Sequence, residues 1–120
     1  MNLTDFAKEV HENAVAHGWW SEERTFGEII ALCHSELSEA LEEYRNKKPL
    51  FYFVETNGFM VTDIEELRHE KPEGISTELA DCIIRILDFC GAAGIDIEEV
   101  IKRKHEYNKT RPYRHGGKRI

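Results

Sequence analysis

The sequence lacks the features that mark membrane and secreted proteins. Its 120 residues contain no run of 18 apolar side chains, which is about the minimum for a transmembrane helix. The first residues, Met1 to Asp5, lack the basic start and the apolar stretch of a signal peptide. We therefore expect a cytoplasmic protein with no membrane partner.

Cysteine is also scarce, and its spacing does not favour a metal site or a disulfide. The three cysteines are Cys33, Cys82 and Cys90, and no C-x-x-C pair occurs. The count is odd, and each cysteine falls in an apolar segment with helical periodicity. Buried, reduced thiols are thus expected, rather than disulfides or zinc ligands.

Length and charge limit the domain count and the kind of partner. With 120 residues, 41% of them apolar, the chain allows one domain, residues 1–120, with one core. The net charge of −7 argues against a general nucleic-acid binder, so no nucleic-acid partner is expected. Residues 102–119 nevertheless hold eight lysines and arginines and a single acid, Glu106. An acidic body with a basic tail suits a metal site that also accepts a polyanion.

Apolar periodicity and capping residues predict an all-α fold, a bundle of four main helices. Residues 109–120, which include Pro112, are expected to form a tail or loop. The four expected helices are one capped by Thr4 or Asp5 and ended by Gly18, one from near Ser21 to about Arg45, one over 77–90 capped by Ser76, and one from Asp96 to about Asn108.

A hairpin-like insertion is predicted between the second and third helices. The apolar runs Leu50–Val54 and Phe59–Thr62 flank Asn57-Gly58, a typical hairpin turn. Asp63 and Glu66 have the spacing of a capping box, which allows a further helical turn. A lone hairpin is marginal in water, and an exposed apolar edge strand favours association. We therefore expect a homodimer or a dimer of dimers, that is, a homotetramer.

Two acidic pairs carry the strongest functional signal. They are Glu36-Leu-Ser-Glu39 and Glu78-Leu-Ala-Asp81, each within an expected helix. Residues three apart share a helix face, so each pair directs two carboxylates to one side. If the two helices pack together, four carboxylates converge and repel one another unless a cation lies between them. Oxygen ligands of this kind suit Mg²⁺, with Mn²⁺ as a substitute.

The alternative is that these acids are merely solvated surface, since the chain has 23 acidic residues. The position of Glu36 argues against this. Glu36 and Glu43 border the apolar stripe of their helix beside Ile29 and Ala40, and Glu39 lies further out. Carboxylates at the edge of a core face are less easily explained as solvated surface.

The fourth helix carries polar residues where core residues are expected. Its apolar stripe, Ile97, Val100 and Ile101, continues into Lys104 and Asn108. Such an inconsistency is typical of functional sites. Lys104 is therefore a candidate phosphate-binding residue; the alternative is a lysine that extends its ammonium to solvent at a fraying helix end.

Taken together, these segments resemble the MazG-like nucleoside triphosphate pyrophosphohydrolases, members of the all-α NTP pyrophosphatase superfamily. Two departures are a serine, Ser35, where the family motif begins with an acid, and a longer gap between the acidic pairs. The resemblance covers most of the chain and rests on Gly18-Trp19-Trp20, Glu36 to Arg45, Lys71 to Gly74, Glu78 to Asp88, Lys104-x-x-x-Asn108 and Arg111 to Gly117.

The resemblance implies Mg²⁺-dependent hydrolysis of a nucleoside triphosphate to the monophosphate and pyrophosphate. It makes Glu36, Glu39, Glu78 and Asp81 the metal ligands, with Glu39 as the preferred general base. The expected substrate-binding residues are Lys104, Asn108, Arg111 and Arg114 for phosphate or sugar, with Lys104 and the arginines stabilising the leaving pyrophosphate, and Trp19 or Trp20 for stacking on the base, unless these two are core aromatics.

Two other functions compete with this one. A di-iron carboxylate bundle requires two Glu-x-x-His pairs, and the sequence has only one such spacing, Glu66 to His69, outside the four expected helices. A non-catalytic helical module could instead bind nucleotides, or RNA through its basic tail. The intact set of four carboxylates disfavours a non-catalytic module.

Overall fold

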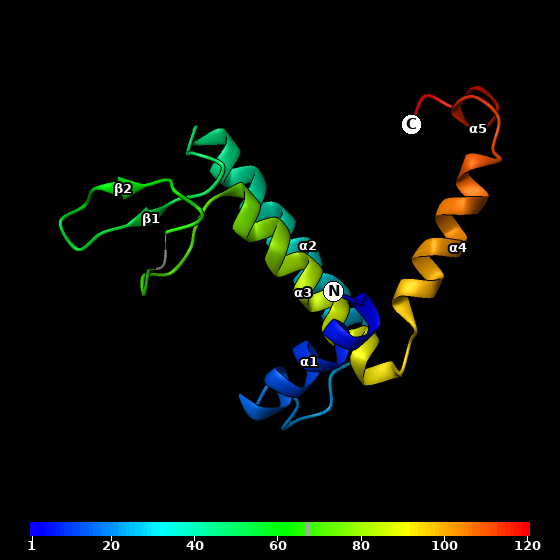
Figure 1. Cartoon of the computed structure of the whole chain (residues 1–120), viewed down its shortest axis with the longest axis horizontal. Coiled ribbons are helices and arrows are strands. Elements are labelled where there is room, and N and C mark those ends of the chain that lie inside the picture. Colours follow the sequence, from blue (N-terminus) through cyan, green and yellow to red (C-terminus); the bar gives the residue numbers. More distant parts are fainter. Residues whose placement is uncertain (67) are drawn as a thin grey trace. The chain divides into compact units, whose positions relative to one another are not determined.

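The computed structural model describes residues 1–66 and 68–120. This part of the chain is mostly helical, as the all-α prediction requires, with one small two-stranded sheet (Figure 1). None of its helices is long and apolar enough to cross a membrane. The elements are α1 Leu3–Ala16, α2 Phe26–Arg45, β1 Phe53–Val54, β2 Met60–Val61, α3 Ile75–Ala93, α4 Ile97–Lys109 and α5 Arg114–Gly117.

The chain forms two compact units, which we describe separately. One comprises residues 1–17 and 87–120, and the other residues 18–86. Helix α3 contributes its first three turns to the second of these units and its last residues to the first. The single domain over 1–120 and the four-helix bundle stay predictions.

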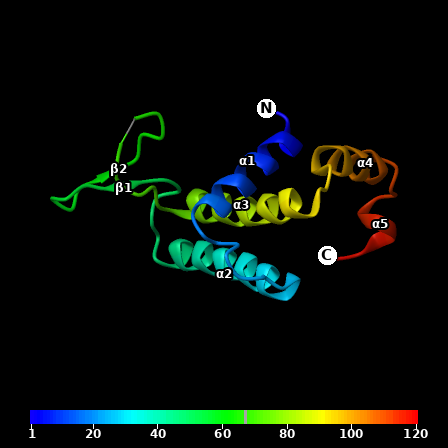
Figure 2. The same cartoon turned by 90° about the horizontal axis from the view of Figure 1, so that it is seen from below.

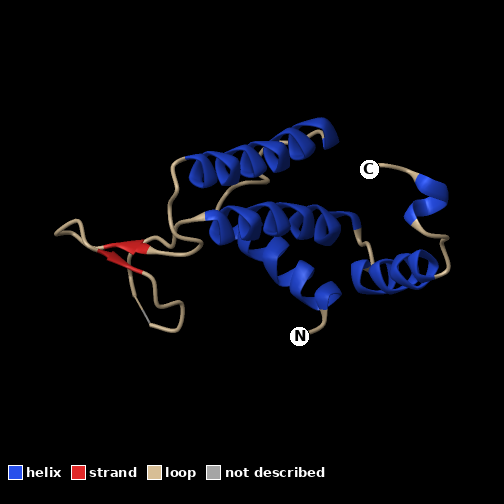
Figure 3. Ribbon diagram, turned by 90° about the horizontal axis from the view of Figure 1, so that it is seen from above, coloured by secondary structure: helices blue, strands red, loops and turns tan. Residues whose placement is uncertain are grey.

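In the unit of residues 18–86, α2 lies beside the first turns of α3 (Figures 2 and 3). The Nε atom of Arg85 donates to Oε1 of Glu36 across 2.9 Å, and Cys33 is hydrogen-bonded to Cys82. Nearer the insertion, the Glu43 carboxylate accepts a hydrogen bond from the Tyr52 hydroxyl, and the backbone of Tyr52 pairs with that of Glu73 just before α3. Cys33, in the first half of α2, lies against Cys82 well inside α3, whereas Glu43, near the end of α2, is linked through Tyr52 to Glu73 before the start of α3, so the helices are antiparallel.

The predicted hairpin is present but shorter than expected. Phe53 pairs with Val61 and Val54 with Met60, and Gly58 forms the turn with a φ of 88° that favours glycine. Tyr52 and Phe53 are buried whereas Leu50 and Val54 are exposed, so only part of the run 50–54 matches the exposed edge strand that the sequence suggested. Residues 63–66 form a turn in place of the extra helical turn.

The second helix begins at Phe26, so the predicted start near Ser21 was wrong. The Thr25 side chain accepts from the backbone N–H of Glu28 and caps the helix there. Gly18, with a φ of 83°, turns the chain beforehand, and Ser21 donates to its carbonyl. The prediction failed because Ser21 and Thr25 are both suitable N-cap residues, and α2 uses Thr25.

The third helix runs from Ile75 to Ala93, longer at both ends than the predicted 77–90. Ser76 is inside the helix, and its backbone N–H donates to the Leu50 carbonyl. Gly91 does not end the helix. An added Cβ there would lie 2.5 Å from the Ala7 carbonyl oxygen, so this glycine permits a close approach to α1.

The core of the other unit is formed where α1 packs on the last turns of α3. Ala7, Leu87 and Cys90 are buried there, and all three cysteines of the chain are buried and free, as predicted. The partly buried side chains packed around this core are Phe6, Val10, Ile95 and Ile97.

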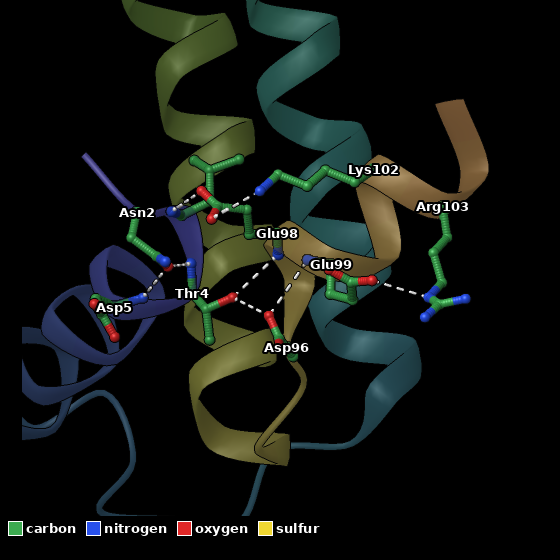
Figure 4. A network of polar contacts seen from close by, with 9 residues as sticks. Asn2, Thr4, Asp5, Asp96, Glu98, Glu99, Lys102 and Arg103 are labelled. Atoms are coloured by element: carbon green, nitrogen blue, oxygen red, sulfur yellow. Dashed lines mark hydrogen bonds and ion pairs between the residues drawn. The ribbon is translucent and has the colours of Figure 1, made fainter. Parts of the chain in front are cut away.

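The N-terminal ends of α1 and α4 hold each other through polar contacts (Figure 4). Thr4 Oγ1 donates to Asp96 across 2.6 Å and accepts from the backbone N–H of Glu98. In return, the Glu98 carboxylate accepts from the backbone N–H of Leu3. Helix α1 is therefore capped by Asn2 and not by Thr4 or Asp5, whereas the predicted Asp96 cap of α4 is confirmed.

Helix α4 is exposed beyond its first residues. Every side chain from Val100 to Thr110 is exposed, so Lys104 does not occupy a buried position as its stripe suggested. The predicted tail contains the short helix α5, in which His115 and Gly116 have positive φ angles.

We predict that Gly91→Ala lowers the free energy of unfolding by about 1–3 kcal/mol, because the new methyl group overlaps the Ala7 carbonyl. Gly27→Ala is the matched control. Gly27 is a helical glycine whose added Cβ would meet only Thr25 Oγ1, at an ordinary contact distance of 4.0 Å, so alanine should stabilise α2 by roughly 0.5–1 kcal/mol. Urea denaturation measures both, and equal stabilisation by the two substitutions would contradict the close packing at Gly91.

Candidate metal centre

Three of the four predicted ligands meet between α2 and α3. Glu36, Glu78 and Asp81 each offer a carboxylate oxygen, and these oxygens lie within 4.8 Å of one another. Glu36 projects from the middle of α2, and the other two from the first turns of α3, where a spacing of three places them on one face. The predicted convergence of the two pairs is thus present for these three residues.

Glu36 is buried and has a cationic partner. Its exposed fraction is 7%, and the guanidinium of Arg85 forms an ion pair with it at 2.9 Å. Arg85 lies four residues after Asp81 and so shares its helix face. One arginine cannot neutralise several carboxylates, so the cluster keeps an excess of negative charge.

Glu78 is the most strongly perturbed acid of the cluster. Burial, followed by hydrogen bonding to Glu39 and the negative charge of Glu39, raises the pKa of Glu78 to about 7. Smaller contributions come from Glu36 and Asp81. Its Oε2 atom is buried with no hydrogen-bond partner among the described residues, which is unusual for a carboxylate oxygen.

The pKa of Asp81 is also raised, first by burial and then by the charge of Glu36. The cations Arg85 and Lys71 act in the opposite direction. Burial and carboxylate repulsion exceed the attraction of these two cations. The cluster therefore favours a proton or another cation at neutral pH.

Glu39 lies outside the triad. Its side chain is exposed, in agreement with its predicted position away from the apolar stripe. It still interacts with Glu78, since its charge and hydrogen bonding raise the pKa of that residue. Glu39 is therefore a neighbour of the three clustered carboxylates and not an equal member.

The residues present fit a hard divalent cation. All three clustered donors are carboxylate oxygens, the type that Mg²⁺ and Mn²⁺ prefer. The partnerless Oε2 of Glu78 and the raised acid pKa values mark a place where positive charge would be favourable. Softer metals prefer the thiolate and imidazole ligands that the triad lacks.

The four predicted phosphate-binding residues of the C-terminal region belong to the other unit. There, the Lys104 ammonium lies 5.0 Å and the Arg111 guanidinium 5.6 Å from the centre of the Tyr107 ring. Asn108 and Arg114 are exposed. A role for Lys104, Asn108, Arg111 and Arg114 beside the carboxylates stays a prediction.

Trp19 is exposed and stacks with an arginine. Its exposed fraction is 62%, and the Arg24 guanidinium lies 5.6 Å from its ring centre while Arg24 Nε donates to its carbonyl. The hollow beside it reaches Glu28 in the first turn of α2. From Glu28 to Glu36 is roughly 12 Å along the helix axis, so Trp19 is not part of the triad. Trp20 is half-buried.

No functional role for Arg85 or Tyr52 was predicted from the sequence. The spacing Asp81 to Arg85 could have placed Arg85 on the acidic face of α3. Tyr52 gave no such signal, because its contact with Glu43 depends on the path of the insertion.

Comparison of the chain with protein-family models, with curated proteins and with solved structures finds no match. The interpretation of the centre therefore depends on its own geometry.

We predict that the Glu78 carboxyl makes stability depend on pH in the absence of divalent metal. The group binds its proton more tightly when folded, so its contribution is complete below about pH 4.5 and is lost as the pH rises to about 7. Glu78→Gln removes this titration and should flatten the decline, measured by urea denaturation in EDTA at pH 5 and pH 8. Glu42→Gln, an equal charge change at an exposed position of α2, should keep it. Identical pH dependence in wild type and Glu78→Gln would rule out the raised pKa.

Proposed function

We propose that this protein is a Mg²⁺-dependent nucleoside triphosphate pyrophosphohydrolase with a MazG-like four-helix bundle. The proposed substrate is an NTP or dNTP, non-standard nucleotides included. The observation that carries the proposal is the triad of Glu36, Glu78 and Asp81 with its partnerless buried oxygen. Its carboxylates accumulate negative charge that a divalent cation, shared with the phosphates of a substrate, would offset.

In the proposed reaction, water attacks the α-phosphorus and the bond from this atom to the bridging oxygen of the β-phosphate breaks. The products are the nucleoside monophosphate and pyrophosphate. Bound Mg²⁺ would supply charge neutralisation of the phosphate oxygens and a lower pKa for the attacking water. Glu36, Glu78 and Asp81 would hold the ion, and Arg85 keeps Glu36 oriented.

Glu39 is our choice for the general base that accepts the water proton. It is exposed and stands outside the triad, so it is not committed to holding the ion. It is near enough to Glu78 to raise the pKa of that residue, so it borders the centre. A base needs this combination of nearness and a free carboxylate.

The basic region 102–119 would supply the cations that complement the triphosphate. Lys104, Arg111 and Arg114 would stabilise the leaving pyrophosphate, and Asn108 would contact phosphate or sugar. Exposed Trp19 would stack on the base.

The second candidate is a non-catalytic module that binds nucleotides or RNA. It is favoured by the basic C-terminal region, where Lys104 of α4 and Arg111 just after it both lie against the Tyr107 ring. Such a module would bind polyanions with steep salt dependence and release no pyrophosphate.

The first functional prediction is that the wild-type protein releases pyrophosphate from NTPs or dNTPs in Mg²⁺ but not in EDTA. Glu78→Gln and Asp81→Asn should each lower kcat/KM at least about a hundredfold, because each removes a ligand charge. Glu42→Gln is the control, with the same charge change on another face of α2. No pyrophosphate from a panel of common and modified nucleotides, or full activity in both triad variants, would refute the proposal.

Lys104→Met tests whether α4 belongs to the active site. Methionine keeps the apolar stem and removes the ammonium, so loss of a charge-assisted phosphate contact should lower kcat/KM about ten- to a hundredfold with folding intact. Lys102→Met is the control, because Lys102 is an exposed lysine of the same helix that pairs with Glu98. Wild-type kinetics in Lys104→Met would remove α4 from the site.

The helices of the centre also carry apolar surface that suits a second copy of the chain. Large side chains of both α2 and α3 are between 38% and 70% exposed, far more than isolated surface residues explain. Together with exposed Leu50 and Val54 of the insertion, this surface is the reason to expect a homodimer or homotetramer. The exposed side chains are Phe26, Ile30, Leu37, Leu41 and Tyr44 on α2 and Leu79, Ile83, Ile84 and Ile86 on α3.

We therefore predict a dimer or tetramer in light scattering at micromolar concentration. Ile83→Lys, at a position 54% exposed, should shift the protein toward monomer, because it places a charge on the apolar surface. Ser38→Lys, at an exposed polar position of α2, should leave the assembly unchanged. A wild-type monomer would contradict the expected oligomer.

A further inference from the structure

The insertion reaches the acidic face of α2 through one buried tyrosine. The Tyr52 side chain is 4% exposed, and its hydroxyl donates to both carboxylate oxygens of Glu43, at 3.1 and 3.0 Å. A buried hydroxyl shared between the two oxygens of one carboxylate restricts the rotation of that carboxylate. Glu43 is thus held in one orientation.

The backbone of Tyr52 is fixed just as firmly to the start of α3. It exchanges hydrogen bonds with Glu73, at 3.1 and 2.8 Å, and the Leu50 carbonyl accepts from Ser76 within the first turn of α3. Gly74 allows this pairing, since a Cβ there would lie 2.5 Å from the Leu50 carbonyl oxygen. Tyr52 therefore connects α2 to the turn of α3 that carries Glu78.

Glu43 continues the row of carboxylates on α2. It lies seven residues after Glu36 and four after Glu39, so the three share one helix face. Burial, then the hydrogen bond and charge of Glu43, and then the charges of Glu73 and Glu78 raise the pKa of Tyr52 to about 12. The phenol therefore stays protonated as a donor and lies within the electrostatic reach of Glu78.

We propose that Tyr52 is a positioning residue of the metal centre, which acts through Glu43 and sets the separation between the acidic face of α2 and the first turn of α3. The insertion is then part of the metal-binding apparatus, although none of its described residues belongs to the triad. This inference rests on the metal centre of the proposed function, but it does not depend on the reaction.

The test is a titration of the metal-free protein with Mn²⁺. Binding is measured as the decrease in the electron paramagnetic resonance signal of free Mn²⁺. Tyr52→Phe should raise the Mn²⁺ dissociation constant about tenfold, because without its contact to Glu43 the acidic face of α2 is no longer held at a fixed separation from Glu78 and Asp81. Tyr44→Phe is the control, because Tyr44 follows Glu43 directly on α2 but is 70% exposed. It should bind Mn²⁺ as the wild type does.

A purely structural role would lower the melting temperature of Tyr52→Phe without changing its Mn²⁺ affinity, and that result overturns the proposal. Glu43→Gln provides a second route if Tyr52→Phe does not fold, since it should also weaken Mn²⁺ binding severalfold. In the Glu43→Gln background, Tyr52→Phe should change the affinity by less than about twofold, because both act through one contact.

The same titration separates this inference from the proposed function. If the wild type binds Mn²⁺ but releases no pyrophosphate, the reaction is refuted, and the affinities of the variants still decide the role of Tyr52. If the wild type does not bind Mn²⁺, the positioning role is refuted as well.

Discussion

Mutual repulsion of carboxylates between α2 and α3 is the constraint on which this part of the molecule depends. Two full charges at 4.8 Å repel by about 3–4 kcal/mol at an effective dielectric constant of 20. The chain offsets part of this through the Arg85 ion pair and through the raised pKa of Glu78, which lets one acid keep its proton near neutral pH. The remainder favours a bound cation.

The contacts that surround the triad keep the two helices together despite this repulsion. On one side, Cys33 and Cys82 are buried against each other, and burial with hydrogen bonding to Cys82 raises the pKa of the Cys33 thiol. On the other side, Tyr52 joins Glu43 to the start of α3. Apolar packing at one end and a buried hydroxyl at the other thus hold the acids in a geometry that they would not adopt by themselves.

Much of this could be predicted from local patterns, because helices and their caps depend on neighbouring residues. The four long helices, the Asp96 cap and the turn at Gly58 follow from periodicity and turn chemistry. The burial of Glu36 and the exposure of Glu39 follow from their places beside the apolar stripe. The predicted start of α2, near Ser21, was wrong by several residues because Ser21 and Thr25 are both suitable N-cap residues.

The remaining features depend on contacts between distant segments, which a single sequence does not encode in any local pattern. Gly91 looks like a helix terminator until α1 is placed against it, and Tyr52 looks like part of an edge strand until its hydroxyl reaches Glu43. Lys104 continues the apolar stripe of α4, but the side chains from Val100 to Thr110 are exposed, so this part of the stripe does not face a core. In each case tertiary packing overrides the local signal.

The most direct test of the central claim, that the acidic centre exchanges a proton for a metal ion, is calorimetric titration of Mg²⁺ in buffers of different ionisation enthalpy. Since the pKa of Glu78 is about 7, roughly half of the molecules carry its proton at pH 7, and binding must release it. The account predicts release of about half a proton per ion at pH 7 and almost none at pH 9. Mg²⁺ binding with no proton release at pH 7, or no binding at either pH, would contradict it.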